Sequence, residues 1–218
     1  MEIKVLYEDN HLIAVYKPAG ILVQGDRSGD ISLLDELKSY IKRKYNKPGN
    51  VFLGLVHRLD RNVDGVIIFA KTSKGASRIS EQFRKHTIVK TYHAWVRGIV
   101  KQSKGILINF LKYDENQNYT SVYDHELPDS EQAELSFEVI KTEGEFTLLK
   151  VILKTGRHHQ IRAQLSHIKH AIVGDTKYGS SITLPDKRIM LTATSLTFET
   201  ATTGEVKTIN TDIPNKIW

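Results

Sequence analysis

The residues best suited to chemistry in this chain lie in one short charged stretch, residues 56–72 (VHRLDRNVDGVIIFAKT). Asp60 and Asp64 are four residues apart, and either carboxylate could act as a general base or as a nucleophile. His57 and Arg58 directly precede them. A charged loop before a buried strand is where rigid scaffolds place function, although a solvated hairpin has the same pattern. Two carboxylates could also serve a glycosidase.

A second group of residues that could do chemistry consists of four histidines close together in sequence: His158, His159, His167 and His170. They could bind a metal ion, but the acidic residue of a metalloprotease helix is missing, and no group that would orient the rings can be assigned. The absence of cysteine excludes disulfides and thiolate metal sites. We therefore expect neither a metal nor an organic cofactor, with a histidine metal site as the alternative.

The charge of the chain indicates a polyanionic partner. Its 218 residues include 31 Lys and Arg against 25 Asp and Glu, a formal net charge of +6. Such a balance favours nucleic acid as the partner, although an ordinary basic protein can have it too. The basic residues gather in three groups that we expect to flank the active site: residues 38–47, residues 71–90, and residues 154–162. No signal peptide and no membrane-length apolar run is present, which predicts a cytoplasmic protein.

The elements that must position these residues follow from hydrophobic periodicity and turn signals. Helices are expected over residues 32–45, 73–86 and 158–168, the first with Ser32 and Asp35 as a capping box. Strands are expected over residues 3–7, 12–16, 66–70, 89–98, 105–113, 120–124, 133–141, 145–154, 193–199 and 205–209. Strands dominate without regular βαβ alternation, so we predict one α+β domain over residues 1–218 with a mixed, largely antiparallel sheet and flanking helices.

Five ordered blocks of the sequence resemble the RluA family of RNA pseudouridine synthases. They are residues 16–23 (YKPAGILV), similar to the family's NKPAG loop; residues 57–60 (HRLD) with Gly65 and the strand that follows; residues 90–98 (KTYHAWVRG); residues 155–162 (TGRHHQIR); and residues 174–179 (GDTKYG). The resemblance runs from about residue 5 to residue 200. It implies the catalytic-domain fold of that family, with an active-site cleft across the sheet and no accessory RNA-binding domain ahead of it.

The resemblance also implies a reaction and the residues that perform it. A uridine of ribosomal or transfer RNA would be isomerised to pseudouridine, with Asp60 as the catalytic carboxylate that either attacks covalently or removes a proton from the sugar. Tyr92 would lie against the uracil and remove the proton at C5, or else fill the core. Arg157 would pair with Asp60 and keep it ionised, or else contact a phosphate.

RNA contacts are expected from the same blocks. The uridine must be extruded from its helix, and Arg58 is the candidate for filling the space that it leaves. His57, Lys71, Lys17 and Arg162 complete the expected RNA-binding set. For His57 a packing role is favoured, and for Arg162 a phosphate contact and a salt bridge are both open. Oligomeric state cannot be predicted.

The chain departs from the family pattern at a few positions. Residues 63–65 (VDG) stand where the family commonly has Thr-Ser-Gly, so that Asp64 adds a carboxylate whose repulsion could oppose ionisation of Asp60. Thr192 stands in place of a usual histidine, as does Gln24 at the end of the opening loop. These departures leave a non-catalytic RNA-binding protein of the same fold as the alternative function.

Overall fold

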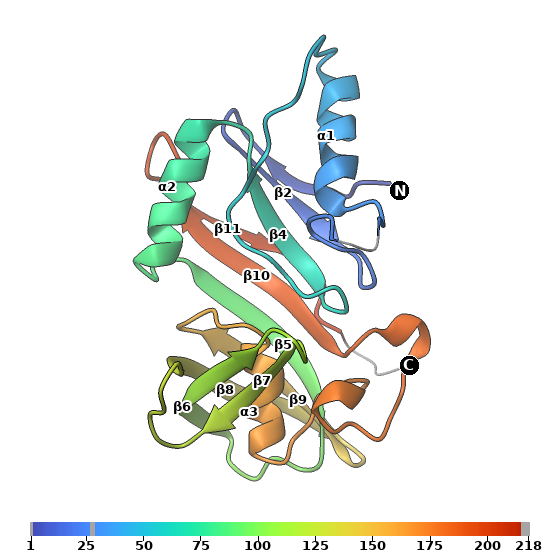
Figure 1. The fold of residues 1–218 in the computed structure, drawn as a ribbon, viewed down its shortest axis with the longest axis vertical. Helices are drawn as coiled ribbons and strands as arrows, with labels where there is room; N and C mark the ends of the chain where they lie inside the picture. The colour runs from blue at the N-terminus through green and yellow to red at the C-terminus, as the bar shows by residue number, and fades with distance from the viewer. Residues whose placement is uncertain (1, 27–28, 215–218) are drawn as a thin grey trace. The chain divides into compact units, whose positions relative to one another are not determined.

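The structure, a computed structural model, describes residues 2–26 and 29–214, and they form two compact units (Figure 1). The first comprises the residues up to 89 together with 193–212, and the second comprises 90–192 with the end of the chain. Within the described residues, no helix is both long and apolar enough to cross a membrane. The prediction of a single functional domain over residues 1–218 stays a prediction.

The first unit is built on a five-stranded antiparallel arrangement. The strands follow one another in the order β1 (Val5–Glu8), β2 (Leu12–Lys17), β4 (Asp64–Ala70), β10 (Leu191–Glu199) and β11 (Val206–Asn210), and the short β3 (Gly54–Leu55) pairs with β4. Strands β2 and β4 are buried along nearly their whole length. Their apolar side chains form the core of this unit, which makes β4 a rigid support for the loop that precedes it.

Two helices cover this unit. Helix α1 (Leu33–Lys44) begins with the predicted capping box, because the Ser32 hydroxyl accepts from the Asp35 amide at 3.3 Å and donates to its carboxylate at 2.6 Å. Helix α2 (Ser73–Arg84) begins after Thr72, whose hydroxyl accepts from the Gly75 amide at 3.1 Å. Both predicted helices are confirmed, and their ends differ from the predictions by one or two residues.

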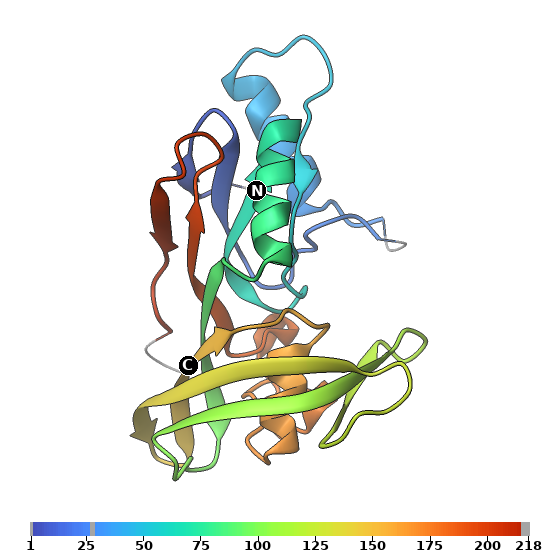
Figure 2. The same cartoon turned by 90° about the vertical axis from the view of Figure 1, so that its left-hand side faces the viewer.

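The second unit is a twisted antiparallel sheet with one helix packed on one of its faces. Its strands lie in the order β5 (Val89–Arg97), β9 (Phe146–Leu153), β8 (Glu131–Glu143), β6 (Lys104–Asp114) and β7 (Tyr119–Tyr123). Figure 2 shows the long β6 and β8 running side by side. Helix α3 (Gln160–His167) packs on this sheet, where Gln164 donates to the Asn109 amide oxygen at 2.8 Å.

The predicted fold class is confirmed: the structure is α+β, and strand pairs such as β1–β2, β2–β4, β5–β9, β8–β9, β6–β8 and β6–β7 are antiparallel. Three short elements were not predicted, namely β3 and the 3-10 helices η1 (Thr176–Tyr178) and η2 (Pro185–Lys187). Elements of two or three residues are too short to show a periodicity, so the sequence contains no pattern that would reveal them.

Candidate active site

Asp60 lies in the first unit, in the loop that joins β3 to β4. Its side chain is partly exposed, whereas Leu59 and Val63 on either side are 8% and 2% exposed. The Val63 amide donates to the Asp60 carbonyl at 3.1 Å and closes a tight turn. The apolar neighbours therefore anchor the turn in the core and leave the carboxylate at its surface.

A buried lysine lies beneath this loop. The Lys17 side chain, at the end of β2, is fully buried, and its ammonium donates to the carbonyls of Pro18 at 3.0 Å, Arg61 at 3.0 Å and Val63 at 2.6 Å. An ammonium has three protons to donate, and each of them finds a carbonyl here. Two of the three acceptors belong to the loop of Asp60, so Lys17 fixes that loop by binding its backbone.

The environment of Lys17 opposes its charge. Burial is the main cause that lowers the pKa of Lys17 to about 8; Asp64 and Asp60 act in the opposite direction, and Arg61 acts in the same direction as burial. Lysine ordinarily titrates near 10.4, far above neutral pH. The charge that binds the loop of Asp60 should therefore be lost at a mildly alkaline pH.

The loop of Asp60 is also tied to the turn after β2. The Gly20 amide donates to the Arg61 carbonyl at 2.7 Å, and the Arg61 Nε donates back to the Gly20 carbonyl at 2.9 Å. Gly20 has a φ of +86°, which suits glycine. The guanidinium of Arg61 also pairs with Asp30 at 2.7 Å. The two blocks of sequence that resemble the family in this unit thus form one connected loop pair.

Asp64 has a hydrogen-bond partner within the first unit. As the first residue of β4, it accepts a hydrogen bond from the Tyr16 hydroxyl at 2.8 Å. The residue after it, Gly65, has a φ of +121°, and a Cβ atom there would lie 2.6 Å from the Ala193 amide nitrogen. The second carboxylate is therefore held by a partner of its own on the neighbouring strand.

Tyr92 and the loop of Arg157 share one face of the sheet in the second unit. Tyr92 lies opposite Val151 in the β5–β9 ladder, and Lys90, two residues earlier, projects on the same side. The Lys90 ammonium donates to the Thr155 carbonyl at 3.1 Å, which links β5 to the loop before Arg157. Burial lowers the pKa of Lys90 to about 8. Lys90 thus connects the sheet face of Tyr92 to the backbone of the loop that carries Arg157, whose catalytic role stays a prediction, as does that of Tyr92.

The loop of Arg157 is ordered by an amide side chain. The Gln160 amide oxygen accepts from the Arg157 amide at 3.0 Å and from the Thr155 hydroxyl at 2.8 Å, and its nitrogen donates to the Glu134 carbonyl at 3.1 Å. The guanidinium of Arg157 pairs with Glu131 in the same unit. Its predicted pairing with Asp60 stays a prediction. Sequence reasoning assigned no role to Gln160, and it counted Lys90 only as a member of the second basic group, although both stand in the matching blocks.

Two residues expected to bind RNA, Lys17 and Arg162, are buried and make contacts within the protein. Lys17 is fully buried and bonded to three carbonyls. Arg162 donates to Asp175 from Nε at 2.7 Å and from a terminal nitrogen at 2.9 Å, and their side chains are 6% and 1% exposed. Of the two options left open for Arg162, the salt bridge is the one observed. Arg162 follows Arg157 by five residues, and this spacing did not predict the direction of the Arg162 side chain.

The other expected RNA contacts differ in their exposure. Arg58 is exposed beside Asp60, as its expected role requires. His57 packs within the unit, since its Nε2 accepts from the Ile68 amide at 3.1 Å and its ring stacks on Phe83 at 4.8 Å between centroids. These contacts agree with the packing role that the sequence favoured, and a contact of His57 with RNA stays a prediction.

Lys71 is largely occupied within the protein. Its ammonium donates to Glu8 at 2.6 Å and to the Asp9 carbonyl at 2.8 Å, and its side chain is 12% exposed. It also approaches the Tyr45 hydroxyl at 3.5 Å, which places the end of α1 beside the end of β4. Tyr45, within the first basic group, therefore lies beside the end of β4 that is opposite to Asp64, the first residue of this seven-residue strand. The expectation that residues 38–47 flank the active site stays a prediction.

Two of the four histidines of the alternative metal site, His158 and His159, lie ring against ring at 3.9 Å between centroids, and each of the four has a further contact. The His158 ring lies on Tyr113 at 3.9 Å between centroids, His159 contacts the Tyr178 hydroxyl at 2.9 Å, and His167 contacts Asp124 at 3.0 Å. His170 contacts the Arg97 carbonyl at 2.9 Å. Within residues 2–26 and 29–214, no three potential ligands converge on one point.

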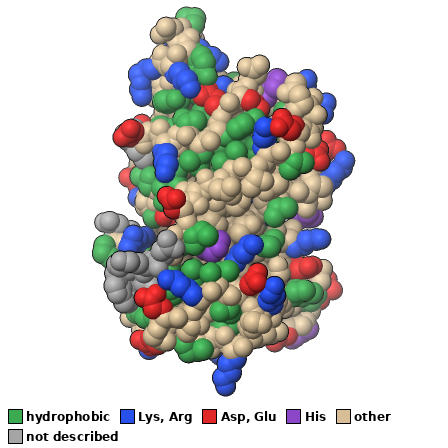
Figure 3. All heavy atoms as spheres, turned by 180° about the vertical axis from the view of Figure 1, so that it is seen from behind, with side chains coloured by type: hydrophobic (Ala, Val, Ile, Leu, Met, Phe, Trp, Pro, Cys, Tyr) green, Lys and Arg blue, Asp and Glu red, His purple; other side chains and the backbone are tan. Residues whose placement is uncertain are grey.

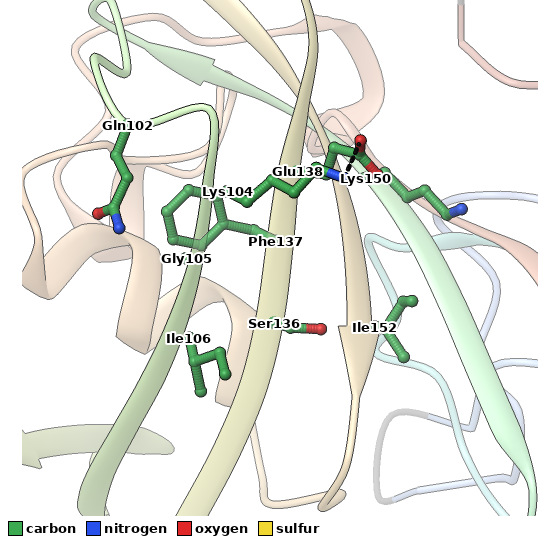
Figure 4. Close-up of a pocket in the computed structure, with 9 residues that line it drawn as sticks. All are labelled: Gln102, Lys104, Gly105, Ile106, Ser136, Phe137, Glu138, Lys150 and Ile152. Carbon is green, nitrogen blue, oxygen red and sulfur yellow. Dashed lines mark ion pairs between the residues drawn. The ribbon is translucent and has the colours of Figure 1, made fainter.

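A hollow of about 570 Å³ lies on the other face of the second unit's sheet (Figure 4). Ile106, Ser136 and Ile152 lie along its floor, and Lys104 pairs with Glu138 at 2.9 Å above them. Because side chains alternate along a strand, these residues point away from the face of Tyr92. The hollow is therefore separate from the candidate active site.

The sequence model of the RNA pseudouridylate synthase family matches residues 11–167, and the chain belongs to this family. A relative called tRNA pseudouridine synthase C, from Yersinia pestis, is 32% identical and aligns over 95% of this chain and 85% of its own length. The protein of that name from Vibrio parahaemolyticus is 33% identical over 82% of this chain and 74% of its own length. A ribosomal large subunit pseudouridine synthase C from Buchnera aphidicola is 34% identical, and the chain spans only 54% of its length.

Solved structures show the same fold. Human RNA Pseudouridylate Synthase Domain Containing 4 superposes with a TM-score of 0.80, covering 97% of this chain and 89% of that protein, at 22% identity. Human RNA Pseudouridylate Synthase Domain Containing 1 gives a TM-score of 0.77 at 20% identity, with 98% and 84% covered. At such identities the likeness concerns the fold alone.

Proposed function

We propose that this protein isomerises a uridine of ribosomal or transfer RNA to pseudouridine, with Asp60 as the catalytic carboxylate. The observation that carries the proposal is the placement of Asp60 on a loop whose backbone is bound by the buried Lys17, in a chain that belongs to the pseudouridylate synthase family. A reactive group gains most from a support that does not move, because small displacements cost large factors in rate.

The reaction needs three tasks that these residues can perform. The bond from the ribose to N1 breaks, the uracil turns, and a bond forms from the same sugar carbon to C5. Asp60 either attacks the sugar or removes a proton from it, and Tyr92 takes the proton that leaves C5 while N1 gains one. Arg157 keeps the carboxylate ionised and oriented. The isomerisation is neutral in electrons and requires no redox cofactor.

RNA binding would rest on exposed basic side chains. Arg58 would fill the space of the extruded nucleotide. Lys42, Arg43 and Lys47, at the end of α1, are exposed, and Figure 3 shows Lys and Arg side chains gathered in that region. Lys74 and Arg78 on α2 are exposed as well. We infer that these residues contact phosphates of the RNA outside the reacting nucleotide, and that RNA affinity falls steeply with salt because counterions are released.

Tritium release from RNA labelled at uridine C5 tests the function. The wild type should release label, and Asp60→Asn, which keeps the size and shape of the side chain, should release none above background while binding RNA as tightly as the wild type. Asp30→Asn is the matched control, since this exposed carboxylate contacts the neighbouring Arg61, and it should stay active. A wild type that binds RNA without releasing label would establish the non-catalytic alternative. Near-normal release by Asp60→Asn would refute the role of Asp60.

A further inference from the structure

The pair formed by Tyr16 and Asp64 lies beside the candidate active site and has no part in the proposed chemistry. The Tyr16 hydroxyl donates to one oxygen of Asp64 at 2.8 Å. The other oxygen, Oδ1, is buried and accepts no hydrogen bond from any residue that the structure describes. A buried carboxylate oxygen without a donor is costly unless nearby positive charge stabilises it.

Lys17 supplies this positive charge. It follows Tyr16 directly in sequence, and it pairs across the β2–β4 ladder with Gly65, the residue after Asp64. The ammonium also donates to the carbonyl of Val63, the residue before Asp64, at 2.6 Å, so the cation lies beside the backbone from which the Asp64 side chain projects. Burial lowers the pKa of Lys17, and Asp64 is the largest influence in the opposite direction, ahead of Asp60.

Tyr16 and Asp64 both stand where the family pattern has another residue. The NKPAG loop has asparagine at the position of Tyr16, and the Thr-Ser-Gly segment has serine at the position of Asp64. The two replacements contact each other directly. Because the two residues that differ from the family pattern form a hydrogen bond with each other, we interpret them as one functional pair.

We propose that Asp64, with the help of Tyr16, is a positioning residue that keeps Lys17 charged beneath the loop and thereby fixes Asp60. A neutral amine has only two protons to donate, so one of the three loop carbonyls would lose its partner, and the remaining bonds would lose their charge assistance. For its catalytic consequence this inference rests on the proposed function of Asp60.

The direction of the effect follows from the groups around Lys17. Asp64 and Asp60 are the negative groups that act on it, and Arg61 is the positive one. Replacing Asp64 by asparagine removes the stronger of the two negative influences, so the pKa of Lys17 should fall below about 8. More of the protein would then carry a neutral lysine at pH 7.5.

The experiment compares Asp64→Asn with Asp35→Asn. Both substitutions neutralise a carboxylate of the first unit that accepts from a hydroxyl, the Ser32 hydroxyl at 2.6 Å in the case of Asp35. The values kcat and KM are measured by tritium release between pH 6 and pH 10. We expect Asp64→Asn to lower kcat about tenfold at pH 7.5, with KM for RNA within twofold of wild type.

The pH profile separates positioning from a merely structural role. In Asp64→Asn, the fall of kcat on the alkaline side should begin at a lower pH than in the wild type, and in Asp35→Asn it should not move. Tyr16→Phe keeps the carboxylate and should give a smaller shift in the same direction. If Asp64→Asn fails to fold, Tyr16→Phe carries the test. Profiles that coincide with the wild type would overturn the inference.

Hydrogen exchange tests the loop without requiring activity. The amides of Gly20 and Val63 donate within the loop pair, so their protection factors report its order. Protection should be lost at a lower pH in Asp64→Asn than in the wild type. If the wild type is inactive yet this shift occurs, the proposed function fails and the positioning role stands. If the wild type is active and protection does not change, the positioning role fails and the proposed function stands.

Discussion

The loop of Asp60 and the loop of Arg157 are ordered by different chemistry. In the first unit, a buried ammonium binds three backbone carbonyls around Asp60. In the second, the neutral amide of Gln160 binds the backbone beside Arg157, and Lys90 adds a single bond to the Thr155 carbonyl. Helix α3, which begins three residues after Arg157, is fixed by the buried pair of Arg162 and Asp175.

The hydrogen bonds that order the two loops should respond differently to pH. Charge-assisted hydrogen bonds are about twice as strong as neutral ones, so the support of Asp60 is the stronger while Lys17 stays protonated. Because the pKa of Lys17 is about 8, that strength is lost in mildly alkaline solution. Gln160 does not titrate, so the bonds it makes should not depend on pH, and only the single bond from Lys90, whose pKa burial lowers to about 8, should weaken in the loop of Arg157.

Of the substitutions that compare the supports of the two loops, Arg162→Met should have the largest effect on the free energy of unfolding. It leaves the Asp175 carboxylate buried without its partner, which typically costs about 3–5 kcal/mol of unfolding free energy. Urea unfolding measures this loss. The double variant Arg162→Met with Asp175→Leu should lose less than the single one, because no charge stays behind. A loss below about 1 kcal/mol in the single variant would show that the pair is not what fixes α3.

Lys17→Met should come next. Without the ammonium, the carbonyls of Arg61 and Val63 lose their donor and the loop can shift, and a displacement of about 1 Å at a reacting group can lower activity about a hundredfold. The rate of tritium release measures it, and Lys17→Arg, which keeps the charge in a larger group, should retain part of the activity. Activity of Lys17→Met within threefold of wild type would contradict the role given to this lysine.

Gln160→Leu should have a smaller effect and sharpen the contrast in pH dependence. It removes one acceptor and one donor beside Arg157, which corresponds to about 1–3 kcal/mol of stability for the groups left unpaired. We expect a roughly tenfold lower kcat/KM, with a pH profile parallel to that of the wild type. A profile displaced along the pH axis would break the distinction between the two supports.

The smallest effect is expected from the exposed lysines at the end of α1. Lys42→Ala with Lys47→Ala should weaken RNA binding and reduce the slope of log affinity against log salt by about 1.4–1.8, the release expected for two phosphate contacts. Filter binding at several salt concentrations measures the slope. Lys101→Ala with Lys104→Ala, two exposed lysines of the second unit, is the control and should change the slope less. Equal slopes for both pairs would remove the end of α1 from the RNA surface.

Much of the fold could be predicted because the signals are local. The capping box of Ser32 and Asp35 and the apolar runs of β2 and β4 are visible in the sequence, and all of them are present in the structure. The resemblance placed Asp60, Tyr92 and Arg157 in ordered blocks. The structure adds that Tyr92 and the loop of Arg157 occupy one face of one sheet.

The roles of the buried cations could not be predicted. Lys17 stands at the end of a strand, where a lysine is usually solvated, and only the three-dimensional path of residues 61–63 shows why it is buried. The partner of Arg162 lies thirteen residues away, and no periodicity connects the two. Asp64 looked like a competitor of Asp60 because four residues separate them, whereas β4 turns its side chain toward Tyr16.

Gly65 limits how this enzyme family member could be redesigned. Because a Cβ atom at this position would collide with the backbone of Ala193, residue 65 must stay glycine for β4 to remain beside β10. Libraries that vary the loop of Asp60 to accept a new nucleotide should therefore leave residue 65 unchanged. Changing the direction of the Asp60 side chain by moving the end of its loop, where β4 begins, would also require a different backbone path for β10.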